Sequence, residues 1–428
     1  MLVLIILITL LALLFTGVPI FAGLTLYGGA LLLMVQGDFG SVSDIIFGEL
    51  NRYLLVAIPL FAFMAHIMIK GRVVDDLYDT AYTFTRHLPG GLAVATILAC
   101  TIFAAISGSS IATALTIGSV AIPQMIRYGY ELKMAYGVVA AGGTLGILIP
   151  PSSPLILYGV TTDASIGALF IAGVIPGLLM AFIFALWAMF RCANPALNIR
   201  RDQRATGTEL WSAFRKSIWA LSLPVFVLGG MYLGIFTATE AAAAGVWLAL
   251  FVTVFIYRSI GWKDIWESAK EACSLSAMLF MILAGATVFG HVLTKMRIPQ
   301  EIVNSLVALD VGPVGFILIM MALIMVLGMF LESIAIILIT MPVILPAMAH
   351  LGINPIWYGI LLVINLEIAM ITPPVGMNLF TIKAITNADF IQIVKGSAPY
   401  VLLMLLALLL VFLFPQLALW LPELMMSK

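Results

Sequence analysis

The chain has 428 residues, of which 63% are hydrophobic and 9% are charged, and its formal net charge is zero. Average soluble proteins carry about 25% charged residues, so this composition excludes a soluble globular domain. The charges form no basic tract and the three cysteines form no disulfide framework, which excludes nucleic acid as a partner and a secreted disulfide scaffold. Apolar runs close to the roughly 20 residues of a spanning helix recur throughout, and they predict an all-α polytopic protein of the lipid bilayer.

Residues 1–190 predict five membrane spans and one helical hairpin. The first apolar run has no basic segment ahead of it, so we interpret it as a retained span rather than a signal peptide. The segment 91–126 has two short apolar arms around the sequence SGSS at 107–110, which predicts a hairpin that enters and leaves on one side. The fourth span is a broken helix, because its proline pair removes backbone donors. The spans are predicted at 2–16, 18–36, 53–69, 134–158 and 167–190.

Residues 217–428 repeat this organisation after a polar loop at 191–216. An offset of 223 places residues 110–151 on 333–374 without a gap, and 10 of these 42 positions are identical, including the proline pair. Because each half contributes an odd number of spans, the second repeat is predicted to be inverted relative to the first. Its hairpin is predicted at 313–350, and its spans at 217–236, 239–257, 274–292, 356–380 (broken) and 397–420.

The basic residues favour one orientation of these spans. With residues 191–216 in the cytoplasm, 16 of the 20 Lys and Arg residues fall in cytoplasmic loops. Cytoplasmic loops of membrane proteins carry such an excess, so both termini are predicted to be periplasmic in a bacterial inner membrane. The four basic residues that fall outside are Arg52, Lys295, Arg297 and Lys428.

Inverted repeats that each contain a broken helix are typical of secondary transporters, whose ions and substrates bind at the breaks. The hairpin tips, at 107–110 and 330–333, are predicted to meet near the midplane and to face these breaks. Unwound backbone carbonyls can replace the water around Na⁺, which predicts two Na⁺ sites, whereas prolines that only kink helices are the structural alternative. The predicted ligands are Ser107, Ser110, Gly146, Ile149 and Pro151 in the first site, and Gly328, Ser333, Ala369, Thr372 and Pro374 in the second.

Polar residues beside the tips are the candidates for binding a substrate. Glu332 stands where the first repeat has Ser109, and it is either a functional carboxylate at membrane depth or a cap of the following helix. Glu367 stands where the first repeat has Thr144, and we favour a structural acceptor over a cation ligand. The predicted substrate-binding residues are Ser109, Ser152, Ser153, Glu332 and Asn378.

Several stretches of the chain resemble a known transporter family. With SGSSIAT, GGTLGILIPPSSPLILYG, GIFTATEAAAAG and ITPPVGMNLF, the sequence is similar to the large membrane subunit (M subunit, DctM-like) of tripartite ATP-independent periplasmic (TRAP) transporters. The resemblance covers essentially the whole chain. Ala238 replaces the proline of the family's usual TPTEAAA, which is a change in a loop.

The resemblance implies an elevator-type, ion-transporter-like architecture with the hairpins and broken helices in a mobile domain. It also implies Na⁺-driven uptake of organic acids of the C4-dicarboxylate or sialic acid class, with no organic cofactor. The implied partners are a soluble periplasmic substrate-binding protein and a small four-helix membrane subunit. The chain starts directly at the first repeat, so the small subunit is expected to be a separate polypeptide.

Two alternatives remain open at this point. One is a stand-alone Na⁺/dicarboxylate or citrate symporter of the same architecture, which would need no binding protein. The other is an intramembrane enzyme that uses Ser110 or Glu332, for which the sequence offers no catalytic partner. The sequence contains no HExxH, phosphate-binding-loop or GxSxG motif, so we expect a transporter and not an enzyme.

Overall fold

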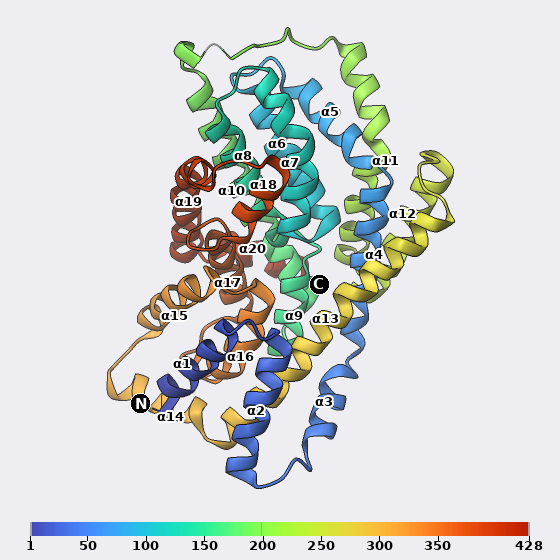
Figure 1. Cartoon of the computed structure of the whole chain (residues 1–428). Helices are drawn as coiled ribbons and strands as arrows, with labels where there is room; N and C mark the ends of the chain where they lie inside the picture. The colour runs from blue at the N-terminus through green and yellow to red at the C-terminus, as the bar shows by residue number, and fades with distance from the viewer. Residues whose placement is uncertain (1, 198, 427–428) are drawn as a thin grey trace.

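The computed structural model describes residues 2–197 and 199–426, and every regular element in them is a helix (Figure 1). The first half contains α1 (Leu2–Phe15), α2 (Ile20–Gln36), α3 (Val42–Leu50), η1 (Tyr53–Val56), α4 (Ala57–Lys70), α5 (Val73–Thr85), α6 (Gly91–Ser107), α7 (Ser110–Arg127), α8 (Leu132–Leu148), α9 (Ser153–Thr162), α10 (Ile166–Cys192) and η2 (Pro195–Leu197). The second half contains α11 (Gly207–Tyr232), α12 (Ala238–Phe251), η3 (Val252–Ile256), α13 (Trp262–Lys295), α14 (Ile298–Ala308), α15 (Pro313–Gly328), α16 (Ser333–His350), α17 (Pro355–Met370), α18 (Met377–Thr386), α19 (Phe390–Leu413) and α20 (Gln416–Met426).

Seven helical segments of the described residues are long and apolar enough to cross a membrane, so the predicted all-α polytopic class is confirmed. One of the seven is α16, which belongs to the hairpin predicted at 313–350 and has 18 residues. Its length alone is also compatible with a crossing, and the hairpin therefore stays a prediction. The other six segments coincide with predicted spans: Tyr53–Lys70, Leu132–Thr162, Ile166–Cys192, Ala238–Ile256, Trp262–Lys295 and Phe390–Leu413.

Several helix boundaries differ from the prediction, and α19, for example, begins at Phe390 rather than 397. Helix α11 begins at Gly207 rather than 217, because Thr206 and Glu209 form a capping box inside the polar loop. Helix α13 begins at Trp262 rather than 274 and runs for 34 residues. The last predicted span is interrupted, because Pro415 cannot continue α19 and a separate helix follows.

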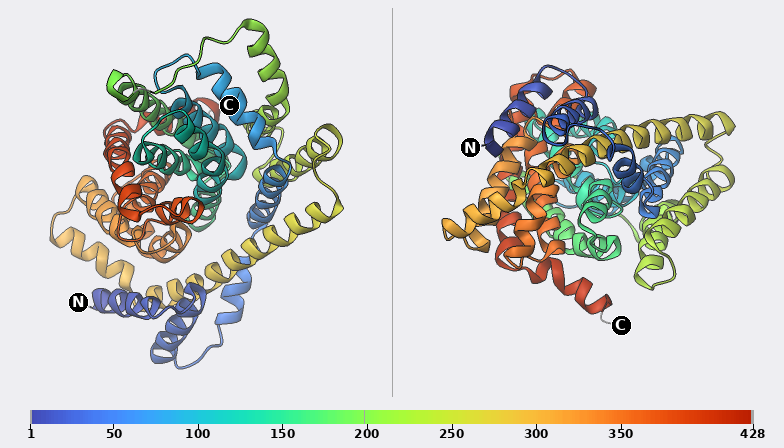
Figure 2. Two further views of the ribbon diagram at one scale, coloured as in Figure 1. Left: turned by 45° about the horizontal axis from the view of Figure 1, so that its top comes forward. Right: turned by 90° about the horizontal axis from the view of Figure 1, so that it is seen from below.

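The hairpins and broken helices pack into one bundle. Helix α8 packs against α6, α7 and α19, and α17 packs against α9, α10, α15 and α19. Helix α13 runs along the outside of this bundle and contacts α2, α3, α4 and α16 (Figure 2). At 1.5 Å per residue α13 is about 51 Å long, which exceeds the ~30 Å hydrocarbon core and requires a tilted helix or a projecting end.

The second helices of the two hairpins, α7 and α16, have matching positions along the chain. The bounds of α7 and α16 differ by 223 residues at both ends, and the proline pairs that follow keep the same offset. Both pairs, Pro150–Pro151 and Pro373–Pro374, contain a cis peptide bond. The first pair is buried, whereas the second pair is exposed. The two breaks are thus similar in position along the chain but differ in their access to solvent.

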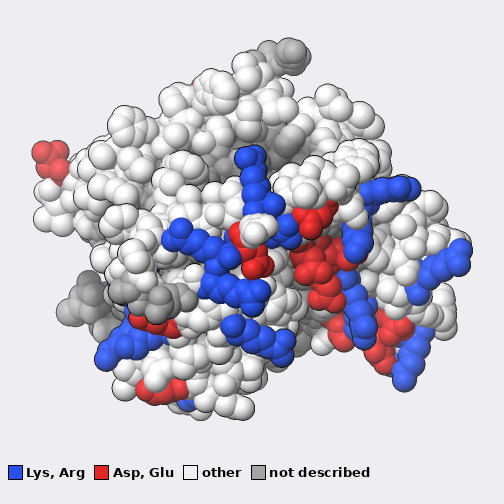
Figure 3. Space-filling model, turned by 90° about the horizontal axis from the view of Figure 1, so that it is seen from above, with Lys and Arg blue, Asp and Glu red and all other residues white. Residues whose placement is uncertain are grey.

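Charged side chains gather on the face at the top of Figure 1, opposite to α3 and α14 (Figure 3). Arg86 and Glu209 form an ion pair there at 2.7 Å. The Tyr82 hydroxyl donates a 2.5 Å hydrogen bond to Asp202 and, with Tyr128, lowers the pKa of this carboxyl below its ordinary value. These contacts join the end of α5 to the loop before α11 and to the first turn of α11. Lys428, one of the four basic residues predicted outside, lies beyond the described residues.

Candidate functional site

Each predicted break is an irregular segment between two helices. Helix α8 ends at Leu148 and α9 begins at Ser153, whereas α17 ends at Met370 and α18 begins at Met377. Prolines remove backbone donors in both segments, so carbonyls of the preceding turn lose their helical partners. Such carbonyls are the groups that coordinate Na⁺ in broken-helix transporters.

The first break lies directly against the first hairpin tip. A Cβ added to Gly108 would lie 2.4 Å from the carbonyl oxygen of Pro151, and one added to Gly146 would lie 2.4 Å from the carbonyl oxygen of Ser109. Only glycine permits such approaches, and Gly108 also has a positive φ of 60°. The Ser107 hydroxyl lies 2.8 Å from the Thr113 hydroxyl. The tip and the break thus bring four backbone or hydroxyl oxygens into one region.

Ile149 takes a different place from the other predicted ligands of the first site. It follows the last residue of α8 with an extended backbone conformation and is 7% exposed. Its side chain packs against Gly177 of α10, where an added Cβ would meet it at 2.6 Å. Only its backbone carbonyl is therefore available as a ligand, as the sequence interpretation requires.

The second break approaches the second tip less closely. An added Cβ on Gly328 would lie 2.6 Å from the Cβ of Ala369, and the Ser333 hydroxyl lies 3.5 Å from the sulfur of Met370. The Thr372 hydroxyl donates to the carbonyl of Ile368 at 2.6 Å. Pro374 is exposed and has no described contact with the tip. Four of the five predicted ligands therefore gather near the end of α17, and Pro374 stands apart.

Both hairpin tips line one cavity of about 70 Å³. The first tip contributes Gly108 to Ile111, and the second contributes Glu332 to Ile334. Ser153 and Pro154 come from the start of α9, and Leu275 and Leu279 come from α13. Ligand pockets usually measure about 300–1,000 Å³, so this cavity holds water molecules or small ions rather than an organic acid in the conformation described.

The residues predicted to bind substrate have different roles around this cavity. Ser109 caps α7 by accepting from the Ala112 amide at 3.3 Å, whereas Glu332 precedes α16 without a side-chain capping bond. Glu332 is therefore not used as a cap, and its carboxylate lines the cavity. Ser152 is fully buried and caps α9 at the Leu155 amide, while Ser153 lines the cavity.

A buried polar cluster connects the two halves of the chain behind the first tip. The Ser110 hydroxyl donates to Glu367 Oε2 at 3.2 Å and accepts from Asn378 Nδ2 at 2.7 Å. All three side chains are at most 2% exposed. Ser110 opens α7, Glu367 lies one turn before the end of α17, and Asn378 lies in the first turn of α18. The cluster thus fixes the first tip to both sides of the second break.

Two residues of this region make contacts that the sequence does not indicate. Glu367, which we expect to be a structural acceptor within the bundle, accepts a hydrogen bond from Ser110, a predicted Na⁺ ligand 257 residues away. The only signal in the sequence was a carboxylate inside an apolar run, which marks a functional position by default. Thr113 was not singled out, and its hydroxyl contacts Ser107 and also donates to the Ser109 carbonyl at 2.8 Å.

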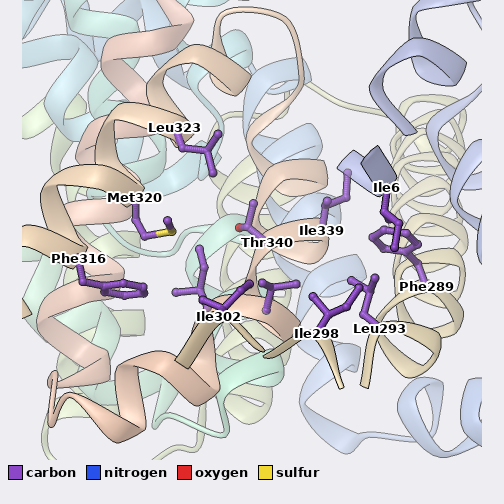
Figure 4. Close-up of a pocket in the computed structure, with 12 residues that line it drawn as sticks. Ile6, Phe289, Leu293, Ile298, Ile302, Phe316, Met320, Leu323, Ile339 and Thr340 are labelled. Carbon is purple, nitrogen blue, oxygen red and sulfur yellow. The ribbon is translucent and has the colours of Figure 1, made fainter. Parts of the chain in front are cut away.

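A larger pocket of about 220 Å³ lies apart from the tips, between α13, α14, α15 and α16 (Figure 4). Phe289, Ile302, Phe316 and Met320 are among its lining residues, and the single polar side chain is Thr340. The Thr340 hydroxyl is already bonded to the Ile336 carbonyl. A pocket without free polar groups offers no ligand for an ion or an acid, so this pocket is not a candidate site for either.

The sequence profile described as "Tripartite ATP-independent periplasmic transporter, DctM component" matches residues 7–417. The chain belongs to this family. Among relatives of this DctM component, the C4-dicarboxylate TRAP transporter large permease protein DctM of Pseudomonas aeruginosa is 40% identical over 92% of each chain. The sialic acid TRAP transporter large permease protein SiaM of Vibrio cholerae is 31% identical over 97% of each.

The fold of this DctM component also has a counterpart among solved structures. The crystal structure of the Alcanivorax borkumensis YdaH transporter is similar with a TM-score of 0.63, covering 89% of this chain and 87% of that one. The two sequences are 15% identical, so the likeness concerns the fold alone. The chain is thus a multi-pass TRAP transporter large permease subunit, a transport protein by family.

Proposed function

We propose that this permease drives Na⁺-coupled uptake of organic acids of the C4-dicarboxylate or sialic acid class. The observation that carries the proposal is the shared cavity, in which serines of one tip face Glu332 and Ser333 of the other. Three C4-dicarboxylate permeases are 36–40% identical to the chain, and a sialic acid permease is 31% identical. A C4-dicarboxylate is therefore the first substrate to test.

Two Na⁺ sites belong to this proposal, one at each break. The first uses Ser107, Ser110 and the carbonyls of Gly146, Ile149 and Pro151, and the close approach of Gly108 to the Pro151 carbonyl supports it. The second uses residues around the end of α17. The proposed ligands of this second site are Gly328, Ser333, Ala369, Thr372 and Pro374. Because Pro374 is exposed, it binds the ion only after the second break closes on the tip.

Substrate is proposed to bind between the tips, in contact with Ser109, Ser152, Ser153, Glu332 and Asn378 at the cavity or just behind it. Because the cavity of about 70 Å³ is smaller than an organic acid requires, binding needs the tips to separate. We propose an elevator mechanism, in which the bundle of hairpins and broken helices moves relative to α13 and its neighbours. The matching bounds of α7 and α16 support the two inverted repeats, 1–190 and 217–428, that this mechanism uses.

The proposed setting is a bacterial inner membrane with both termini in the periplasm. A periplasmic binding protein delivers the substrate, and a small four-helix subunit completes the membrane complex. One relative is named an isethionate TRAP transporter permease protein DctMQ and is longer than this chain, which spans 62% of it. That length supports a second membrane subunit as a partner of this chain.

Uptake of a labelled C4-dicarboxylate into proteoliposomes tests the proposal. One set of vesicles contains the chain with its small subunit and binding protein, and a matched set omits the binding protein. An inward Na⁺ gradient is expected to drive accumulation only in the complete set, and a K⁺ gradient is expected to drive none. Accumulation without the binding protein would favour the stand-alone symporter, and accumulation without Na⁺ would refute Na⁺ coupling.

A further inference from the structure

The cluster of Ser110, Glu367 and Asn378 has unused binding capacity. Glu367 is 0% exposed, and its Oε1 atom has no hydrogen-bond partner among the described residues. Asn378 is also 0% exposed, and its Oδ1 atom is equally unpartnered within the described part of the chain. Two buried acceptor oxygens therefore flank the Ser110 hydroxyl, which bonds to both residues. Buried oxygens without donors are rare and call for a ligand.

The charge balance of this cluster points to a cation. Among the described residues no Lys, Arg or His forms an ion pair with Glu367. A buried charge is costly unless it is paired or coordinates a metal ion. The first turn of α7 lies beside the carboxylate through Ser110, but a helix end supplies only about half an elementary charge. Oε1 still lacks a partner after these contributions.

The cluster also borders the cavity between the tips, through Ser110. Ser110, Ile147 and Met370 line the cavity, and the backbone of Ile147 lies beside the Glu367 carboxylate. Ser110 touches the cavity on one side and Glu367 on the other. Only the Ser110 hydroxyl therefore separates the cavity from the Glu367 carboxylate along this line of contacts. The end of α17, one turn away, adds carbonyl dipoles that favour a cation.

We propose that Glu367, Asn378 and Ser110 form an additional Na⁺ site, distinct from the two carbonyl-rich sites at the breaks. Glu367 supplies the compensating negative charge, Asn378 supplies its amide oxygen, and Ser110 turns its proton away from the ion. Hard cations such as Na⁺ prefer oxygen ligands of these types. The inference rests on the proposed Na⁺ coupling. The additional site shares Ser110 with the proposed Na⁺ site at the first break, and it therefore connects the ions at the two breaks.

The test measures the number and the affinity of bound Na⁺ in the full complex. The Na⁺:substrate ratio comes from reversal potentials of uptake in proteoliposomes, and affinity comes from Na⁺-dependent thermal stabilisation in detergent, with choline as the replacement cation. Glu367→Gln keeps the shape and removes the charge, so it should transport with one Na⁺ fewer per substrate and bind Na⁺ at least roughly tenfold more weakly. Glu301→Gln, which removes an exposed carboxyl on α14, is the control and should match the wild type.

Asn378→Leu covers the case in which Glu367→Gln does not fold, because it removes only the amide and keeps the volume. It should weaken Na⁺-dependent stabilisation at least roughly tenfold. Variants with the wild-type Na⁺:substrate ratio and Na⁺ affinity would overturn the inference. A variant whose uptake loses its pH dependence while its Na⁺:substrate ratio stays unchanged would also overturn it, because the group bound by Glu367 would then be a proton. If the wild type itself shows no Na⁺ dependence, the proposed function fails and not this site alone.

Discussion

Replacing Gly146 by alanine is the sharpest perturbation of the first break. The added Cβ would lie 2.4 Å from the Ser109 carbonyl oxygen, 2.6 Å from the Ser109 carbonyl carbon and 2.8 Å from the Ser110 amide nitrogen. All three atoms belong to the backbone of the hairpin tip, so no side chain can rotate away. The tip itself has to move.

The size of the effect follows from this geometry. Ordinary carbon contacts begin near 3.5 Å, so the tip must retreat from α8 by about 1 Å. Overpacking of this kind costs about 1–3 kcal/mol. If the tip returns to its wild-type position only when Na⁺ binds, the same energy weakens Na⁺ binding by roughly 5- to 150-fold.

Na⁺-dependent uptake in proteoliposomes and thermal unfolding in detergent measure both effects. Gly229→Ala is the matched control, because an added Cβ there, in the last turn of α11, meets no atom within 4 Å. It should leave uptake unchanged and raise stability by about 0.5–1 kcal/mol through helix propensity. Wild-type Na⁺ affinity in Gly146→Ala would refute the close packing of tip and break.

Three further variants test other contacts. Ser110→Ala leaves the Glu367 carboxylate without its hydroxyl donor, so thermal unfolding should show a loss of about 1–3 kcal/mol. Asp202→Asn should lower the melting temperature more at pH 7 than in acid. The Tyr82 hydroxyl lowers the pKa of this carboxyl, so its charge stabilises the fold above its unfolded pKa of about 3.9 and loses that effect as pH falls through its folded value. Thr237→Ala removes the cap of α12 and should cost about 1 kcal/mol in the same assay.

Each of these variants has its own control. Ser119→Ala, on the exposed side of the same helix as Ser110, should be nearly neutral, and an equal loss in both would argue against the cluster. A pH-independent difference for Asp202→Asn would contradict the assigned role of its charge. Thr237→Ser keeps the capping oxygen, so equal destabilisation by serine and alanine would contradict the cap.

The sequence predicted much of the fold because apolar length and proline position act locally. The proline pairs located both breaks, and the bounds of α7 and α16 follow the 223-residue offset. The predicted boundaries were wrong where capping and proline signals lie at helix ends. The capping box at Thr206 starts α11 earlier than predicted, and Pro415 ends α19 before the predicted end of the span. Both signals were present in the sequence and were outweighed by hydropathy.

The candidate site was less predictable, because its contacts are not local. Nothing in the neighbourhood of Ser110 indicates Glu367 or Asn378, which lie 257 and 268 residues away. The repeat alignment paired Glu367 with Thr144, a position in its own helix, and so gave no hint of a contact across the repeats. The difference between Glu332 and the capping Ser109 also required coordinates, since both occupy the position before a helix.

The unequal exposure of the two proline pairs bears on the order of events during a transport cycle. Pro373 and Pro374 are exposed, while Pro150 and Pro151 are buried within the chain. If the two proposed Na⁺ sites bind ions, the ion at the exposed second break should exchange first, and the ion at the buried first break should be released only after the bundle opens. Slow and fast phases of Na⁺ release would then report the two halves of the chain separately.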